Sequence, residues 1–111
     1  HGFPDSGVSV SNGTRSSPAP GSFQVSLVEE LVRALPGEKI TSCQDYPGAP
    51  YERRMCGDDN VQGRHVNGSP DACTQNPLSS SDRFVHLEQS RAIRQYQRHA
   101  VLQAFDLALP P

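Results

Sequence analysis

Large apolar side chains are scarce in this chain. Among its 111 residues there is no tryptophan and one methionine, and the apolar fraction is 34%, whereas proline and glycine number 10 and 9. A domain of this size must bury most of its apolar surface to offset the entropy lost on folding. We therefore expect a small core, long loops, and additional stabilisation from a disulfide or a partner.

Long hydrophobic runs and a strong net charge are also lacking. No apolar stretch approaches the ~18 residues that a membrane-spanning helix needs, so no membrane span is predicted. The net charge is -2, which predicts no general attraction to nucleic acid or to a membrane surface. Nine of the ten basic residues are arginine, a side chain suited to fixed ion pairs. A protein partner or a larger assembly is favoured over nucleic acid.

The three cysteines, Cys43, Cys56 and Cys73, have no spacing typical of a zinc site. One disulfide and one free or intermolecular thiol are expected, and three pairings are open. Cys43 and Cys56 flank a Pro/Gly-rich loop, and closing a loop of this size can stabilise the fold by ~3 kcal/mol. We favour this pair.

Two further features favour secretion. Asn12-Gly13-Thr14 and Asn67-Gly68-Ser69 are N-glycosylation sequons, and each is also an Asn-Gly turn signal. The chain begins at His1 rather than at methionine, which indicates a removed leader or a fragment. Together with a disulfide, these features predict a secreted glycoprotein.

Two segments have helical periodicity. Residues 26–35 carry a capping box, Ser26 with Glu29, and apolar residues at i, i+3, i+4 and i+7 before Pro36-Gly37 ends the helix. Residues 82–108 lack interior glycine and proline and predict a second, long helix that stops before Pro110-Pro111. The alternative for this tail is a short strand over Phe84–Leu87 that leads into a helix starting near Ser90.

The predicted fold class is α+β, or mostly α, with these two helices and a few short strands. Residues 1–22 form a loop-rich N-terminal segment with a short strand near residues 7–11, and residues 23–111 form one small domain. A further strand is expected at 39–43, and a long Pro/Gly-rich loop at 44–78. The main core is predicted between two apolar faces, Val28, Leu31, Val32 and Leu35 on one helix and Val101, Leu102, Phe105 and Leu109 on the other.

Four arginines of the tail form the clearest candidate for a partner-binding surface. On a continuous helix, Arg83, Arg91, Arg94 and Arg98 fall within about 80° of one another. Such a stripe is either a solvated face or a contact for an acidic partner or a phosphate group.

The order of strand, small-residue loop, helix, Leu35-Pro36-Gly37, strand and Tyr46-Pro47-Gly48 resembles the N-terminal part of the cutinase and acetylxylan esterase family. That family consists of secreted α/β-hydrolases, and the resemblance covers about 45 residues. It implies that the loop over residues 13–22 would supply an oxyanion donor, and that the enzyme, if active, would be a serine ester hydrolase.

The resemblance ends where catalysis would begin. The family nucleophile lies in a G-x-S-x-G turn, whereas Ser90, the one serine at a strand-to-helix position, has Glu88 and Ala92 in place of the glycines. His99 precedes Asp106 on the same predicted helix, so the two do not form a triad with Ser90. The resemblance therefore implies a truncated or inactive relative, with Ser90 as a weak catalytic candidate.

The first residues carry two other resemblances. His1-Gly2-Phe3-Pro4 resembles an oxyanion-hole segment of epoxide-hydrolase-like proteins, and as a mature N-terminus it resembles the start of secreted copper monooxygenases. The second resemblance implies a copper-dependent oxidase in which His1 and a second histidine bind the metal through nitrogen. The second ligand would be one of three residues, His65, His86 or His99.

No complete catalytic or ligand-binding signature is present. We therefore expect a small secreted binding or assembly protein without catalytic activity or cofactor of its own. The alternatives are the truncated or inactive cutinase-like hydrolase and the copper-binding protein.

Overall fold

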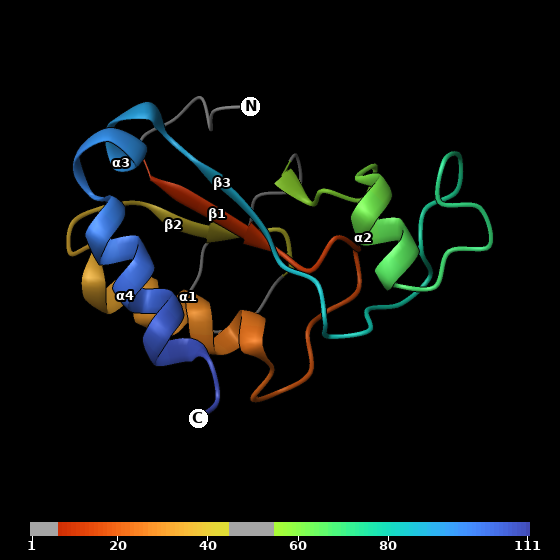
Figure 1. Cartoon of the computed structure of the whole chain (residues 1–111), viewed down its shortest axis with the longest axis horizontal. Helices are drawn as coiled ribbons and strands as arrows, with labels where there is room; N and C mark the ends of the chain where they lie inside the picture. The colour runs from red at the N-terminus through yellow and green to blue at the C-terminus, as the bar shows by residue number, and fades with distance from the viewer. Residues whose placement is uncertain (1–6, 45–54) are drawn as a thin grey trace.

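The computed structural model describes residues 7–44 and 55–111, and it confirms an α+β fold (Figure 1). The elements run β1 (Val8–Ser11), α1 (Phe23–Ala34), β2 (Ile40–Ser42), α2 (Val61–Val66), β3 (His86–Gln89), α3 (Arg91–Tyr96) and α4 (Arg98–Ala108). Within these residues no helix is both long and apolar enough to cross a membrane. The strands and helices α1, α3 and α4 form the larger part of the molecule, and α2 lies apart from them beyond the end of β1.

The sheet is small and mixed, in the order β2-β1-β3. The central strand β1 runs parallel to β2, with Val8 opposite Ile40, and antiparallel to β3, with Val8 opposite Gln89. Gly7 directly precedes Val8 and has a φ of 124°. A Cβ on Gly7 would lie 1.9 Å from the carbonyl oxygen of Lys39. Only glycine fits such a position, so the start of the sheet depends on its missing side chain.

Helix α1 begins at Phe23, three residues before the predicted start at Ser26. Ser26 therefore lies inside the helix, and its predicted capping box does not form. Ser22 is the N-cap residue, and its backbone N–H donates to the carbonyl of Ala19 in the turn that precedes the helix. The turn at Pro20-Gly21, rather than a side-chain cap, sets where the helix begins.

The prediction of one helix over residues 82–108 is wrong. The alternative, a strand that leads into a helix near Ser90, is confirmed, although the strand lies two residues later than the predicted Phe84–Leu87. Residues His86–Gln89 form β3, because they pair with β1 and so add a third strand to the sheet. The backbone N–H of Ser90 then donates to the carbonyl of Gly7, 3.0 Å away. At Gln97 the backbone leaves helical geometry, φ -120° and ψ 14°, and separates α3 from α4. Tertiary strand pairing overrides a local sequence pattern that also suits a helix.

The main core lies between α1, α4 and one face of the sheet. Its buried members include Leu27, Leu31, Val101 and Ala104, together with Val8 and Val10 of β1. The rings of Phe23 and Phe105 meet across the helix pair with their centres 5.9 Å apart. The predicted packing of α4 on α1 is thus confirmed, and β1 adds the third apolar surface.

Three residues assigned to that core are instead exposed. Val32, Leu102 and Leu109 keep 46%, 59% and 53% of their surface accessible. Helix α4 buries one narrow stripe that includes Ala104 and Ala108, small residues that allow the helices to approach closely. Of the apolar face predicted for this helix, Val101 is buried and Phe105 is half-buried, whereas Leu102 and Leu109 are exposed.

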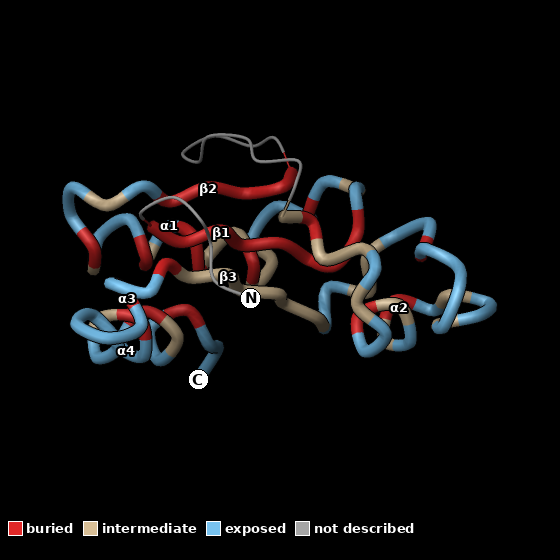
Figure 2. Tube along the Cα trace, turned by 90° about the horizontal axis from the view of Figure 1, so that it is seen from above, coloured by how far each residue is buried: buried red, intermediate tan, exposed pale blue. Residues whose placement is uncertain are grey.

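The segment predicted as a loop over residues 44–78 contains the short helix α2 in its described part, residues 55–78. Its N-cap is Asn60, whose side-chain oxygen accepts a hydrogen bond from the backbone N–H of Gly63 at 2.9 Å. Figure 2 shows that this part of the molecule is mostly exposed or half-buried, whereas β1 and β2 are buried. Residues 55–82, which we call the α2 lobe, therefore depend on polar contacts more than on a core of their own.

Candidate functional site

Neutral polar side chains cluster at the carboxyl ends of the parallel strands β1 and β2, the edge where open α/β sheets commonly bind ligands. They come from the loop after β1, from the first turn of α1 and from the end of β2. None is more than 3% exposed. The cluster comprises Asn12, Thr14, Gln24, Ser42 and Gln44.

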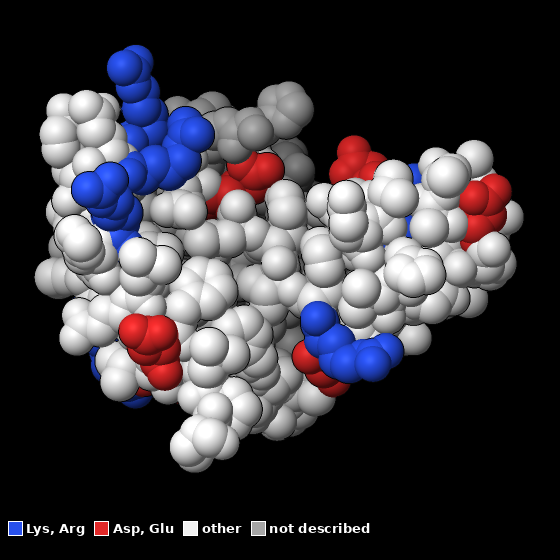
Figure 3. All heavy atoms as spheres, in the orientation of Figure 1, with Lys and Arg blue, Asp and Glu red and all other residues white. Residues whose placement is uncertain are grey.

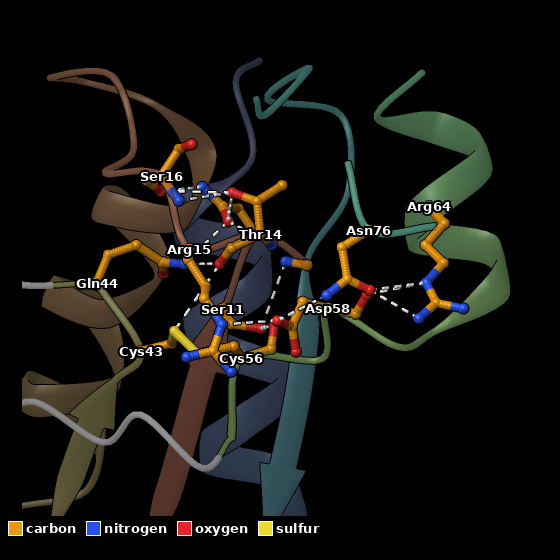
Figure 4. Close-up of polar contacts among 12 residues, drawn as sticks. Ser11, Thr14, Arg15, Ser16, Cys43, Gln44, Cys56, Asp58, Arg64 and Asn76 are labelled. Atoms are coloured by element: carbon orange, nitrogen blue, oxygen red, sulfur yellow. Dashed lines mark hydrogen bonds and ion pairs between the residues drawn. A yellow bond between two sulfur atoms is a disulfide. The ribbon is translucent and has the colours of Figure 1, made fainter. Parts of the chain in front are cut away.

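The members of this cluster bond chiefly to one another, and Figure 4 shows two of them, Thr14 and Gln44. The amide nitrogen of Gln44 donates to the side-chain oxygen of Asn12 at 3.0 Å and to the carbonyl of Thr14. The amide nitrogen of Gln24 donates to the side-chain oxygen of Gln44 at 2.8 Å. The side-chain oxygen of Asn12 also accepts from the hydroxyl of Thr14 at 2.8 Å. A cluster without a titratable group has no acid or base for catalysis, and its bonds hold the loop after β1 against α1 and β2.

The predicted disulfide between Cys43 and Cys56 is confirmed, with the two Cα atoms 4.9 Å apart. Both cysteines are buried, and the hydroxyl of Ser11 donates to the carbonyl of Cys56 at 2.5 Å. The bridge thus ties the end of β2 to the α2 lobe beside the polar cluster. Cys73 is free and exposed.

Both sequon asparagines are built into the fold. The amide nitrogen of Asn12 donates to the carbonyl of Ser16 at 3.0 Å, and that of Asn67 donates to the carbonyl of Asn12 at 2.9 Å. The side-chain oxygen of Asn67 also accepts from the backbone N–H of Ser81 at 2.8 Å. A glycan on either nitrogen would displace these bonds, so it would have to be attached before this part of the chain folds. Glycosylation stays a prediction.

Arg64 organises the outer loop of the α2 lobe. Its guanidinium donates to the side-chain oxygen of Asn76 at 2.7 Å and to the carbonyl of Cys73 at 3.1 Å. Asp58 connects the lobe to the loop after β1 by an ion pair with Arg15 at 2.8 Å. Figure 4 shows these side chains in one row from Arg15 to Arg64. Their bonds go to the chain itself, which indicates a structural role.

Ser90 lies between β3 and α3, where the sequence placed it, and it caps the helix. Its hydroxyl oxygen accepts a hydrogen bond from the backbone N–H of Ile93, and the residue is 7% exposed. The nearest histidine in sequence, His86, pairs through Nε2 with Glu88 at 3.3 Å. No hydrogen bond joins Ser90 to a histidine in residues 7–44 and 55–111. The arrangement provides a helix cap and no base for the hydroxyl.

The histidines considered as metal ligands do not come together. His65 is exposed on α2, His99 is exposed on α4, and His86 is half-buried on β3. Among the described residues, side chains of His, Cys, Asp and Glu nowhere gather in threes that would suit a metal ion. His1, on which the copper hypothesis depends, lies outside the described residues. So does Tyr46-Pro47-Gly48, which carries part of the esterase resemblance.

Three of the four candidate arginines lie within eight residues of one another in the chain, and we call them the arginine face: Arg91 and Arg94 of α3 and Arg98 at the start of α4. All three are exposed. Figure 3 shows basic side chains gathered over the end of the molecule where α3 lies. Within the described part of the chain, none of the three makes an ion pair. Arg83 precedes β3, so the predicted helical stripe of four is wrong for this residue.

A shallow depression of about 250 Å³ lies elsewhere, between α1 and α4. Two of its lining residues, Glu30 and Arg33, form an ion pair with each other. The remaining lining side chains, Ala34, Gln103 and Leu107, supply no further charge. The depression is therefore a weaker candidate for a ligand site than the arginine face.

Sequence reasoning missed the buried polar cluster and Arg64. Glutamines such as Gln24 and Gln44 are usually exposed, and nothing local marks these two as buried partners. One signal was available: Asn12-Gly13-Thr14 directly follows a predicted strand, where a polar turn must satisfy its own backbone groups.

Compared with known proteins, the chain matches no protein-family model, no curated protein and no solved structure.

Proposed function

We propose that the chain is an extracellular binding protein without catalytic activity of its own, and that an acidic partner docks on the arginine face. One observation carries this proposal. Arg91, Arg94 and Arg98 make no ion pair within the described residues, although the chain has 12 acidic residues for 10 basic ones. Exposed guanidinium groups held close together repel one another, and an anionic partner would relieve that repulsion.

The contacts of Ser90 support the non-catalytic part of the proposal. A nucleophilic serine needs a base within hydrogen-bonding reach and an oxyanion donor nearby. The Ser90 hydroxyl instead accepts from the N–H of Ile93. The side chains of Glu88 and Ala92 also occupy the positions where a nucleophile turn requires glycine.

The disulfide supports the extracellular part. Disulfides persist in oxidising compartments and are rare in the cytosol. Cys43 and Cys56 are at most 2% exposed, so this bridge belongs to the packed interior. A buried bridge is a structural one, as expected for a secreted domain with few apolar residues.

A truncated or inactive relative of the cutinase-like hydrolases is the second candidate. It is favoured by the unit β1-α1-β2, in which two parallel strands flank a helix, as α/β-hydrolases require. This candidate and the binding function are compatible, because an inactive scaffold can retain a binding surface. An ester-hydrolysis assay tests for hydrolase activity, and a binding assay tests for the binding function.

Binding to immobilised anionic polymers tests the proposed function. The protein should bind at least one of three probes at low salt: heparin, poly-glutamate or single-stranded DNA. A variant with Arg91, Arg94 and Arg98 changed to Gln should lose that binding. The matched control changes Arg33, Lys39 and Arg83 to Gln, which removes the same charge from other exposed positions. Equal losses in both variants would contradict a specific face and indicate attraction by overall charge.

A further inference from the structure

The composition of the arginine face narrows the class of its partner. We infer that the face binds a sulfated polysaccharide. This inference rests on the function proposed above, because it names the partner of the same surface. It depends on three properties of the segment that carries these arginines: positive charge with no acidic residue within the segment, mainly polar exposed residues between the arginines, and an exposed tyrosine.

The positive charge is continuous along the chain. From Gln89 to Phe105 there is no acidic residue, while Arg91, Arg94 and Arg98 lie within this stretch. Arg91 and Arg94 are neighbours on α3, about 4.5 Å apart along its axis, and Arg98 follows the break at Gln97 as the first residue of α4. The segment therefore brings no carboxylate of its own to a linear polyanion that contacts these guanidinium groups, and Figure 3 shows acidic side chains beside the basic group.

The face lacks the apolar centre of a protein interface. Stable protein interfaces exclude water around a core enriched in apolar and aromatic groups. Here Ile93 is 1% exposed and belongs to the internal core, and the exposed residues between the arginines are mainly Gln95, Tyr96 and Gln97. An acidic protein would find charge here but little apolar area to bury. A hydrated polyanion is held by charge and hydrogen bonds, which the face does provide.

The side chains of the face suit sulfate groups on a sugar. The guanidinium group is planar, weakly hydrated and matched to oxyanions through two parallel hydrogen bonds. Tyr96 is 75% exposed, so its ring is available to stack on the C–H face of a sugar. The amides of Gln95 and Gln97 can bond hydroxyl groups. Charge, stacking and hydroxyl recognition thus come from residues 91–98, which comprise α3, the break at Gln97 and the start of α4.

Nucleic acid fits the face less well. Binding of single strands combines a basic groove with a series of aromatic stacking platforms. The face has Tyr96 alone, and the chain as a whole is acidic at net charge -2. Its partner should therefore be a polymer with separated charges rather than the dense phosphates of a nucleic acid.

The test compares heparin with chemically desulfated heparin, poly-glutamate and single-stranded DNA, using the intact chain and equilibrium binding by fluorescence anisotropy. Heparin should bind tightest, and desulfation should weaken binding at least tenfold. The logarithm of the binding constant should fall with the logarithm of salt concentration with a slope of about -2 to -3, as expected for three released counterions. Changing Arg91, Arg94 and Arg98 to Lys keeps the charge but removes the two-bond geometry, and it should weaken heparin binding several-fold.

The outcomes separate this inference from the proposed function. If poly-glutamate or DNA binds as tightly as heparin through the arginine face, the sulfated-polysaccharide inference is overturned and the proposed function stands. If desulfation changes nothing, the inference also fails. If no polymer binds in a way that depends on these arginines, both fail. Should the Gln variant not fold, the Lys variant and Tyr96→Ala, which should weaken heparin binding about threefold, still decide the question.

Discussion

At the residue scale, two glycines at the joint between the sheet and the α2 lobe are fixed by one aromatic ring. A Cβ on Gly13 would lie 2.7 Å from Cδ1 of Phe84, and a Cβ on Gly63 would lie 2.7 Å from Cε1 of the same ring. Gly13 belongs to the loop after β1 and Gly63 to α2. The Phe84 ring therefore holds the two parts in contact, and each glycine leaves the room that the ring occupies.

We predict that Gly13→Ala destabilises the fold more than Gly21→Ala. Both glycines have φ 75°, so the backbone strain of an alanine, about 1–2 kcal/mol, is the same in each. A Cβ on Gly21 meets nothing within 4 Å, whereas one on Gly13 meets Phe84. The clash should add about 1–3 kcal/mol to the loss of unfolding free energy, measured by urea denaturation. Phe84→Ala in the Gly13→Ala background should restore part of it; strictly additive losses would show that no clash occurs.

Hydrogen bonds within its own loop lower the pKa of Asp71. Its carboxylate accepts from the hydroxyl of Thr74 at 2.7 Å and from the backbone N–H of Cys73 at 3.0 Å. The Thr74 hydroxyl, first, and the Cys73 N–H, next, lower the pKa of Asp71 below its ordinary 3.8. A lowered pKa means that the carboxylate helps to hold this loop above pH 3.8 and that its contribution is lost as the pH falls through the lower folded-state value.

We therefore predict that an NMR titration of Asp71 gives a pKa below 3.8, and that Thr74→Val raises this pKa towards the ordinary value. Hydrogen exchange at the Cys73 amide should quicken in the same acidic range, because its acceptor becomes protonated. An unchanged Asp71 titration in the Thr74 variant would show that this hydroxyl does not set the pKa.

At the scale of elements, the turn at Ser90 decides the architecture of the tail. A strand ends there and a helix begins, and the serine hydroxyl serves the helix. A nucleophile turn also places a serine between a strand and a helix, but it needs glycine where Glu88 and Ala92 stand here, so only the position of Ser90 fits both roles. The bond to Ile93 and the burial of Ser90 assign it to the cap.

We expect Ser90→Ala to lower stability by about 1 kcal/mol, the usual effect of losing an N-cap side chain. Any hydrolysis of p-nitrophenyl esters by the parent protein should continue unchanged in this variant. Thermal melts and the ester assay measure the two effects separately. Ester activity that disappears in a variant which still folds would restore the esterase hypothesis.

The packing of α4 gives a second prediction at this scale. Phe105 is half-buried against Phe23, so Phe105→Ala should lower the unfolding free energy by about 2–3 kcal/mol, less than the ~3–5 typical of a fully buried aromatic. Leu102→Ala is the matched control on the same helix. Leu102 is 59% exposed, and its loss should cost under ~0.5 kcal/mol. A reversed order in chemical denaturation would mean that α4 presents a different face to α1.

At the scale of the whole molecule, the disulfide compensates for the small core. No residue of 55–82 belongs to the main apolar cluster. The disulfide and the polar contacts described above attach this lobe to the rest of the molecule. The bridge closes a loop of 13 residues and limits the freedom of the unfolded chain around it. This division into an apolar part and a covalently attached polar lobe agrees with the low apolar content of the sequence.

Changing both Cys43 and Cys56 to Ser should therefore lower stability by about 3 kcal/mol, a large share of the roughly 5–10 kcal/mol typical of a domain of this size. Cys73→Ser, at an exposed free thiol, is the control and should melt like the parent. Loss of hydrogen-exchange protection in the double variant should concentrate in the α2 lobe. A double variant as stable as the control would show that polar contacts alone hold the lobe.

The sequence by itself determined the packing of α4 on α1 and the strands near residues 8–11 and 40–42, and it favoured the cysteine pair that forms. These features depend on local periodicity, on turn residues such as Pro36-Gly37, and on the short chain between Cys43 and Cys56. Such signals act over a few residues and can be read without knowing the fold.

Tertiary structure alone decided that residues 86–89 form a strand and that Asn12, Gln24 and Gln44 form a buried polar cluster. Residues 86–89 form a strand instead of the predicted helix because β1 provides hydrogen-bond partners for their backbone groups. Polar side chains are buried where distant segments supply their hydrogen bonds, as Gln44 does for Asn12 across 32 positions. The arginine face likewise became three residues instead of four, because Arg83 was placed before β3 by pairing that no local pattern encodes.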